Sequence, residues 1–163
     1  MTSIDYLVKV TEINERQMNP YSETFCLDEL MEEMCFYVKQ ELEKKNKLNV
    51  GVKMITNSRF EKCWINTDRV RLKQIFTILL DRAVKNTDKG YIFYGFHTSV
   101  SNNINFSVDD TGIGAVNGHD VDLSIVQGLV QQFGGEMEIR STIDAGTAIR
   151  FNIVCTPCNL HEN

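Results

Sequence analysis

The chain has 163 residues, of which 42% are hydrophobic and 24% are charged, and its formal net charge is −5. This length and composition are those of one ordinary globular domain with a full hydrophobic core. The acidic excess argues against a nucleic-acid binder, because such proteins usually carry a basic excess.

No part of the sequence is an apolar run long enough to span a membrane, and the N-terminus lacks a signal pattern, so we expect a cytoplasmic protein. The five cysteines form an odd, scattered set, which favours reduced thiols. Only Cys155 and Cys158 have the spacing of metal ligands, and a structural zinc site needs a second such pair. We interpret these two cysteines as part of a frayed C-terminal tail and expect no metal site.

The first segment with helical spacing is residues 3–18, where Ile4, Leu7 and Val8 share one face. The dipeptide Asn-Pro at 19–20 ends it. A helix this short is marginal alone. Two interpretations therefore stay open: the end of a longer preceding helix, or a helix packed on the domain.

Two long amphipathic helices are predicted over residues 27–45 and 68–86, where apolar side chains recur at helical spacing. Between them, alternating apolar residues predict a strand over 48–56 and a short second strand over 63–66.

The second half of the chain predicts two hairpins separated by a helix. Residues 91–100 and 104–108 are rich in aromatic and β-branched residues and form the first hairpin. Residues 121–133 form a third helix, and a last hairpin joins 136–141 to 147–154. The economical assembly is an α+β, two-layer sandwich with three helices on one face of a mixed, mostly antiparallel sheet.

The motif Asp-Thr-Gly-Ile-Gly begins at Asp110 and places a carboxylate at a strand end beside two glycines. Such a carboxylate can accept a hydrogen bond from an exocyclic amine. Alone, this motif is weak evidence, since it is more often an ordinary turn.

Several motifs occur in a fixed order along the chain: Arg-Leu-x-Gln-Ile at 71–75 in a helix ending at Thr87, a hairpin, Asp-Thr-Gly-Ile-Gly at 110–114, Leu-Ser-Ile-Val at 123–126, Gly-Gly at 134–135 and Gly-Thr at 146–147. In this order they resemble HATPase_c, the ATP-binding catalytic domain of two-component sensor histidine kinases, a member of the GHKL superfamily with Hsp90, gyrase B and MutL. The resemblance covers nearly all of residues 25–154. It implies the GHKL (Bergerat) fold.

The resemblance also implies boundaries and roles. Residues 1–20 would be the end of a dimerisation-type helix and a linker, 21–156 the ATPase domain, and 157–163 a tail. The implied nucleotide contacts are a hydrogen bond from the adenine amino group to Asp110, close approach of the base at Gly112 and Gly114, help from Thr147, and a basic residue near the phosphates, Lys85.

One departure from the family pattern concerns the metal. Arg82 stands where the family has the asparagine that ligates Mg²⁺, and a guanidinium cannot ligate a metal. The motif's earlier asparagine is matched by Ile78, while Asp81 and Asn86 point in other directions on a helix. We therefore expect no Mg²⁺ site.

Two further departures concern the phosphates. Asp120 and Asp122 replace glycines at the start of the helix that receives phosphates in the family. They can cap the helix themselves, and each would repel a phosphate charge by about 4 kcal/mol at about 4 Å. In the family a longer mobile loop, the lid, lies between the glycine motif at 110–114 and the second glycine motif, which opens the next helix. Here only residues 115–117 separate the two motifs. The lid is therefore essentially deleted, which argues against phosphoryl transfer.

We hypothesise that Arg82 pairs with Asp120 or Asp122 and closes the phosphate end as an internal salt bridge. The alternative is a solvated arginine and two helix-start acids without mutual contact. Coordinates decide between them.

The leading functional interpretation is a degenerate histidine-kinase ATP-binding domain, a pseudokinase with weak or no Mg-ATP binding that acts in signal transduction by protein contact with a dimerisation domain or a response regulator. No phospho-accepting histidine precedes it, since the histidines are His97, His119 and His161. One alternative is an active histidine kinase (transferase) domain of a longer chain. Another is a stand-alone module of anti-sigma or kinase-inhibitor type that docks, or forms a homodimer, through residues 3–18. A ligand that carries only adenine also stays open.

Overall fold

The computed structural model describes residues 21–58, 61–99, 101–114 and 120–158. Its elements in chain order are β1 (Glu23–Cys26), α2 (Leu27–Lys44), β2 (Val50–Asn57), β3 (Trp64–Thr67), α3 (Arg69–Asn86), β4 (Gly90–Thr98), β5 (Asn103–Asp110), α4 (Val121–Gln132), β6 (Met137–Thr142) and β7 (Gly146–Val154). The helix predicted over residues 3–18 lies outside the described residues.

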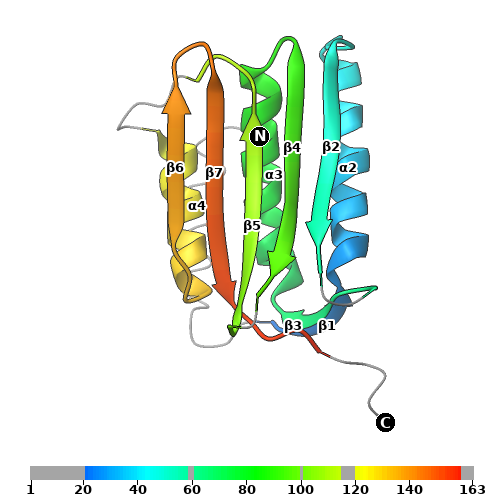
Figure 1. Cartoon of the computed structure of the whole chain (residues 1–163), viewed down its shortest axis with the longest axis vertical. Helices are drawn as coiled ribbons and strands as arrows, with labels where there is room; N and C mark the ends of the chain where they lie inside the picture. The colour runs from blue at the N-terminus through cyan, green and yellow to red at the C-terminus, as the bar shows by residue number, and fades with distance from the viewer. Residues whose placement is uncertain (1–20, 59–60, 100, 115–119, 159–163) are drawn as a thin grey trace.

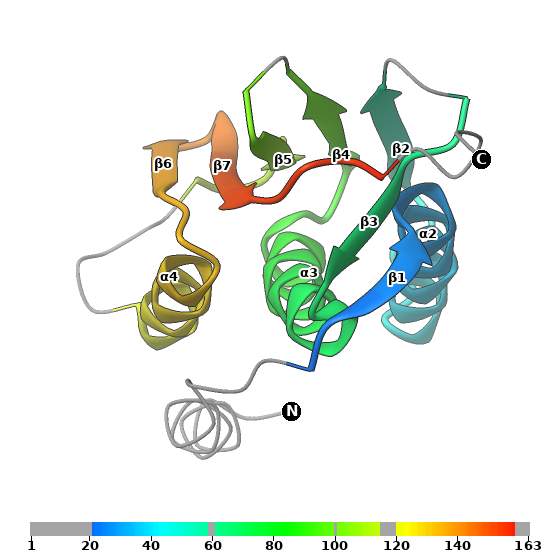
Figure 2. The same ribbon diagram turned by 90° about the horizontal axis from the view of Figure 1, so that it is seen from below.

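The molecule has two layers, with α2, α3 and α4 side by side on one face of a five-stranded sheet (Figures 1 and 2). The strand order is β2-β4-β5-β7-β6. Strands β2 and β4 run parallel, while the other three neighbouring pairs are antiparallel. Both predicted hairpins are present, as β4–β5 and β6–β7. The prediction of an α+β sandwich with three helices on a mixed sheet is confirmed.

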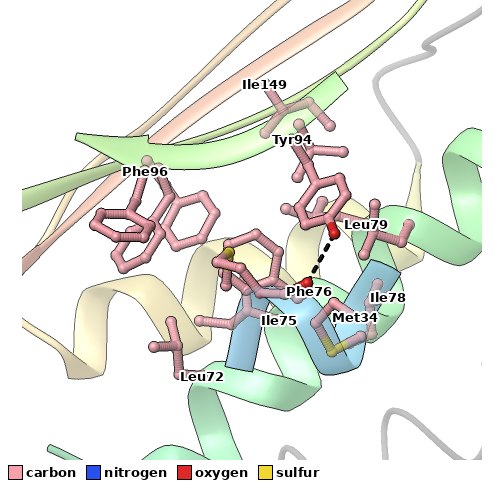
Figure 3. Packing of buried hydrophobic residues seen from close by; sticks show 14 of the residues in the cluster. Met34, Leu72, Ile75, Phe76, Ile78, Leu79, Tyr94, Phe96 and Ile149 are labelled. Carbon is pink, nitrogen blue, oxygen red and sulfur yellow. Dashed lines mark hydrogen bonds between the residues drawn. The ribbon is translucent and has the colours of Figure 1, made fainter. Parts of the chain in front are cut away.

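The core lies between the layers because each element places apolar residues at the spacing its geometry requires. On α2 the buried set is Leu27, Leu30, Met31, Met34, Val38 and Leu42. Phe76 of α3 packs edge-on against Phe106 of β5, with ring centroids 5.5 Å apart. It also packs edge-on against Tyr94 of β4, with ring centroids 6.5 Å apart (Figure 3). The Tyr94 hydroxyl, buried in this core, donates to the Met31 carbonyl oxygen at 2.7 Å, so its polar atom is satisfied.

A small second sheet closes the lower end of the molecule in Figure 1, where β1 pairs antiparallel with β3. Strand β1 was not predicted. The chain after β7 returns to this sheet, and the Cys158 amide donates to the Trp64 carbonyl oxygen at 2.6 Å. The interpretation of Cys155 and Cys158 as a frayed tail is therefore wrong, since Cys155 is also buried.

None of the described helices combines the length and the apolar character that crossing a membrane requires.

Candidate functional site

Asp110 ends β5, where alternate side chains point to the helical layer. The residue is 8% exposed. Its Oδ1 accepts from the Gly112 amide at 2.9 Å, and its carboxylate also accepts from the Thr147 backbone. Burial raises the pKa of Asp110 above its ordinary value, although the Gly112 hydrogen bond and the nearby charge of Arg82 oppose this rise. Asp110 is thus a buried acceptor held in place by two backbone donors.

The two glycines after Asp110 lie against backbone carbonyls of the protein itself. A Cβ at Gly112 would lie 2.1 Å from the Asn86 carbonyl oxygen. Gly114 has φ +64°, and a Cβ there would lie 1.9 Å from the Thr142 carbonyl oxygen. Close packing of the chain therefore requires glycine at both positions, whereas contact with a base stays a prediction.

Thr147 lies beside Asp110 because the two residues are partners in the β5–β7 register. Its side chain is buried, and its Oγ1 lies 3.0 Å from the Ser141 hydroxyl oxygen. Ser141 in turn donates to the Gly114 carbonyl oxygen at 2.7 Å. Ser141 was not predicted, since a serine in a predicted edge strand gives no signal before the hairpin register is known.

Arg82 and Asp120 form a salt bridge between α3 and the start of α4. The Nη2 and Nε atoms of Arg82 lie 2.6 and 3.1 Å from Asp120 Oδ2. The Arg82 side chain is 8% exposed and that of Asp120 is 20% exposed. The predicted pairing is confirmed, and the alternative of a solvated, uncontacted arginine is wrong. Within the described residues, Asp120 is the acid that hydrogen-bonds Arg82.

Asp120 also begins α4. Its Oδ1 accepts from the Leu123 amide at 3.0 Å, which is the N-cap hydrogen bond expected of an aspartate at this position. Burial alone would raise the pKa of Asp120, but the hydrogen bonds from Arg82 and Leu123 outweigh burial and lower it. The carboxylate is therefore held ionised with both oxygens engaged.

The other polar residues at this end of α3 have different contacts or are exposed. Asp81 accepts a hydrogen bond from the Tyr37 hydroxyl on α2 at 2.5 Å, which fixes it on the side facing α2. Asn86 contributes its carbonyl oxygen to the Ile113 amide at 3.1 Å. Lys85 is exposed. No cluster of three or more histidine, cysteine or acidic side chains suited to a metal occurs in the described part of the chain.

The shortened lid predicted at 115–117 lies outside the described residues, as do His119 and His161. His97 is described, in β4, with an exposed side chain.

Three helices layered on this mixed sheet, with a buried aspartate and two glycines at the end of β5, define an ATPase domain of the histidine-kinase type. The chain belongs to the family described as histidine kinase-, DNA gyrase B-, and HSP90-like ATPase, whose model matches residues 67–157. Members of this family bind ATP with Mg²⁺ in general. Both partners of the Arg82–Asp120 salt bridge lie within the matched region.

A curated relative, an uncharacterized sensor-like histidine kinase of Rhizobium meliloti (strain 1021), is 30% identical over 107 residues, which are 52% of this chain and 20% of the relative. The crystal structure of full-length ShkA in complex with AMPPNP is similar with a TM-score of 0.81 and 18% identity, covering 96% of this chain and 36% of ShkA. The Acinetobacter baumannii histidine kinase AdeS has a TM-score of 0.72 at 16% identity, covering 93% of this chain and 76% of AdeS. The chain thus spans a fifth of the curated relative's length.

Proposed function

We propose that this domain is a degenerate histidine-kinase ATPase domain, which binds Mg-ATP weakly or not at all and acts in signal transduction through protein contacts. The observation that supports this most strongly is the Arg82–Asp120 salt bridge. It places a fixed positive charge where the family has a metal ligand and a fixed negative charge where the family has a glycine.

The salt bridge works against Mg-ATP in two ways. A guanidinium has only donors and repels a divalent cation, so Arg82 leaves no ligand for Mg²⁺ at its position. An incoming phosphate would have to take Arg82 from Asp120, whose carboxylate repels phosphate by about 4 kcal/mol at about 4 Å and an effective dielectric near 20. Removing one partner of a buried pair is costly in itself. The pair is therefore a barrier to phosphate rather than a binding site.

At the end of the site where the family binds adenine, this chain keeps the acceptor that the family uses, the Asp110 carboxylate. Asp110 is buried and oriented by backbone amides, which is the pre-organisation an adenine amino group needs. This supports a weak ligand that carries adenine without a phosphate chain, recognised by Asp110 with help from Thr147. Direct roles for Gly112, Gly114 and Lys85 are part of the same proposal.

Isothermal titration calorimetry tests the proposal. Wild-type protein is titrated with ATP, with and without Mg²⁺, and separately with adenosine. We expect a dissociation constant above about 1 mM for ATP in both conditions, which corresponds to about −4 kcal/mol or weaker. Magnesium-dependent binding in the micromolar range contradicts the proposal.

A working kinase domain of a longer chain is the second candidate, and the match to one fifth of a sensor-like histidine kinase favours it. A supplied dimerisation domain that carries a phospho-accepting histidine distinguishes the two. Transfer of radiolabel from ATP to that histidine supports an active transferase, and the degenerate domain transfers none.

The domain division and the partners belong to the same proposal. Residues 1–20 are the end of a dimerisation-type helix and linker, 21–156 the ATPase domain and 157–163 a tail. The partner is a dimerisation domain or a response regulator in the cytoplasm. A stand-alone module that docks or forms a homodimer through residues 3–18 is the variant form, and size-exclusion chromatography with and without that segment separates the two.

A further inference from the structure

A pocket of about 170 Å³ lies at the other end of the helical layer, between the start of α3 and the end of α4. Arg71, which lines it, is about 17 Å along α3 from Arg82, at 1.5 Å per residue. The pocket is therefore separate from the candidate nucleotide site around Asp110 and Arg82, and binding of a ligand in it does not depend on whether the domain binds ATP.

Arg71 is the unusual feature of this pocket. Its side chain is 9% exposed. Its Nε lies 3.2 Å from Asp68 Oδ2. The hydrogen bond and the ion pair of Arg71 within the described residues run from its backbone amide and from Nε to Asp68, and neither uses its two terminal nitrogens. The outer edge of the guanidinium is thus available to a ligand in the pocket.

Asp68 does not fill that role, because both of its oxygens are engaged on the inner side. Its Oδ1 accepts from the Arg71 amide at 3.1 Å as the N-cap of α3, and its Oδ2 faces Arg71 Nε. Asp68 therefore orients the guanidinium and leaves the outer edge for a second acceptor. A planar carboxylate matches that edge with two parallel hydrogen bonds.

The remaining walls indicate the size and polarity of the ligand. Ser22, Thr67 and Gln132 contribute polar groups to the lining, while Phe133 and Val154 contribute apolar surface. The volume is well below the 300–1,000 Å³ typical of drug-sized ligands, so a nucleotide does not fit. The charge of Asp68 disfavours a dianionic phosphate more than a single carboxylate.

We propose that this pocket binds a small organic carboxylate through Arg71, with the Thr67 hydroxyl as a second polar contact and a short apolar chain against Phe133 and Val154. The ligand class is a short-chain monocarboxylic acid. An anion bound there would join the first turn of α3 to the last turn of α4.

Two-dimensional ¹H–¹⁵N NMR of the full chain tests this with sodium butyrate as the probe and sodium chloride at matched ionic strength as the reference. We expect saturable shifts of the amide signals of residues 67–71 and 132–134, with a dissociation constant of about 1 mM for a ligand of this size. Inorganic phosphate at the same concentrations should bind at least about tenfold more weakly.

Matched variants assign the effect to the pocket. Arg71→Lys keeps the charge but loses the bidentate geometry and should weaken butyrate binding at least about tenfold. Thr67→Val should weaken it about threefold. Arg140→Lys, at a side chain that is 81% exposed, should change nothing.

The dispersion of amide signals in the spectrum reports whether each variant is folded. If Arg71→Lys does not fold, the binding of butyrate by Thr67→Val tests the proposal. The proposal is overturned by the absence of saturable shifts up to about 50 mM butyrate, which excludes useful affinity. Undiminished binding by folded Arg71→Lys or by Thr67→Val also overturns it, as does phosphate binding as tight as that of butyrate.

Discussion

The guanidinium of Arg82 and the carboxylate of Asp120 join the last turns of α3 to the first turn of α4 through Nη2–Oδ2 and Nε–Oδ2 contacts of 2.6 and 3.1 Å. In the proposed function, Arg82 stands in the place of a metal ligand and Asp120 in the place of a glycine of the family pattern. Because Asp120 is also the N-cap of α4, the carboxylate that holds Arg82 also fixes where the helix begins. The proposed loss of nucleotide binding and the fixed start of α4 would then depend on the same contact.

The first prediction concerns the energy of this pair. In a double-mutant cycle with Arg82→Met and Asp120→Asn, urea unfolding at pH 7 should give a coupling free energy of about 2 kcal/mol, because both side chains are largely buried. The control is the Arg150–Asp109 pair on the opposite sheet face, whose side chains are 49% and 29% exposed, with coupling below about 1 kcal/mol. Equal coupling in the two cycles would contradict the prediction.

The pH dependence of the same pair has a definite sign. The folded-state pKa of Asp120 is lowered, so its stabilising contribution is present above its ordinary value of 3.8 and is lost as the pH falls below that value. The difference in unfolding free energy between wild type and Asp120→Asn should therefore be constant near neutral pH and shrink below about pH 4. A difference that grew on acidification would show that another group carries the effect.

A second prediction restores the family chemistry. The triple variant Arg82→Asn, Asp120→Gly, Asp122→Gly returns a metal ligand and two helix-start glycines, and it removes two negative charges from the phosphate path. Magnesium-dependent ATP affinity by calorimetry should rise at least about tenfold over wild type. The same variant with Asp110→Asn should lose this gain, because the adenine contact is removed. No gain in the triple variant would place the defect elsewhere, for example in the short lid.

Most of the fold could be predicted from the sequence, because the helices and strands have strong apolar periodicity and turns that contain glycine separate several of them. Strand β1 was missed because Glu23–Cys26 is only four residues long and runs directly into α2. The return of Cys158 to Trp64 was missed because it is a backbone pairing, on which side-chain patterns carry no information. The Arg82–Asp120 contact could be predicted only through the family resemblance, since 38 residues separate the two positions.

The third prediction concerns the loss of stability caused by burying the Asp110 carboxylate. Burial raises the pKa of Asp110, so the ionised carboxylate destabilises the fold and stability from this group is lost as the pH rises through its folded pKa. Asp110→Asn keeps an acceptor for the Gly112 amide and removes the charge. Its melting temperature at pH 7 should exceed that of wild type by about 2–4 °C. The difference should vanish below pH 3.8, the ordinary value for this group, where Asp110 is neutral. A lower melting temperature at pH 7 would mean that attraction to Arg82 outweighs burial.

The fourth prediction separates glycines required by the fold from a glycine that is not. Gly112→Ala and Gly114→Ala each place a Cβ about 2 Å from a backbone carbonyl oxygen, so each should lower the unfolding free energy by more than about 2 kcal/mol. Gly128→Ala is the matched control, because nothing lies within 4 Å of its Cβ in α4, and it should raise stability by about 0.5–1 kcal/mol. If Gly112→Ala were neutral, the carbonyl of Asn86 would have to move without cost, and the glycine would be free to serve a ligand instead.

The last prediction concerns the order in which the cysteine thiols react with an alkylating reagent. Burial raises the pKa of Cys63 to about 12, and it also raises the pKa of Cys155, so neither forms appreciable thiolate at pH 8. Cys35 and Cys158 are half-buried, so water and reagents reach them more readily. Iodoacetamide at pH 8 followed by peptide mass spectrometry should therefore label these two first, and Cys63 only at the rate of global unfolding. Because Cys158 is held by its backbone bond to Trp64, its labelling should be accompanied by faster exchange of the Cys158 amide hydrogen. Rapid labelling of Cys63, with the labelling of the other cysteines unchanged, would mean that the segment around Cys63 opens independently of the domain. The hydrogen bonds that join the Cys63 backbone to Leu27 and Asp28 at the start of α2 argue against this.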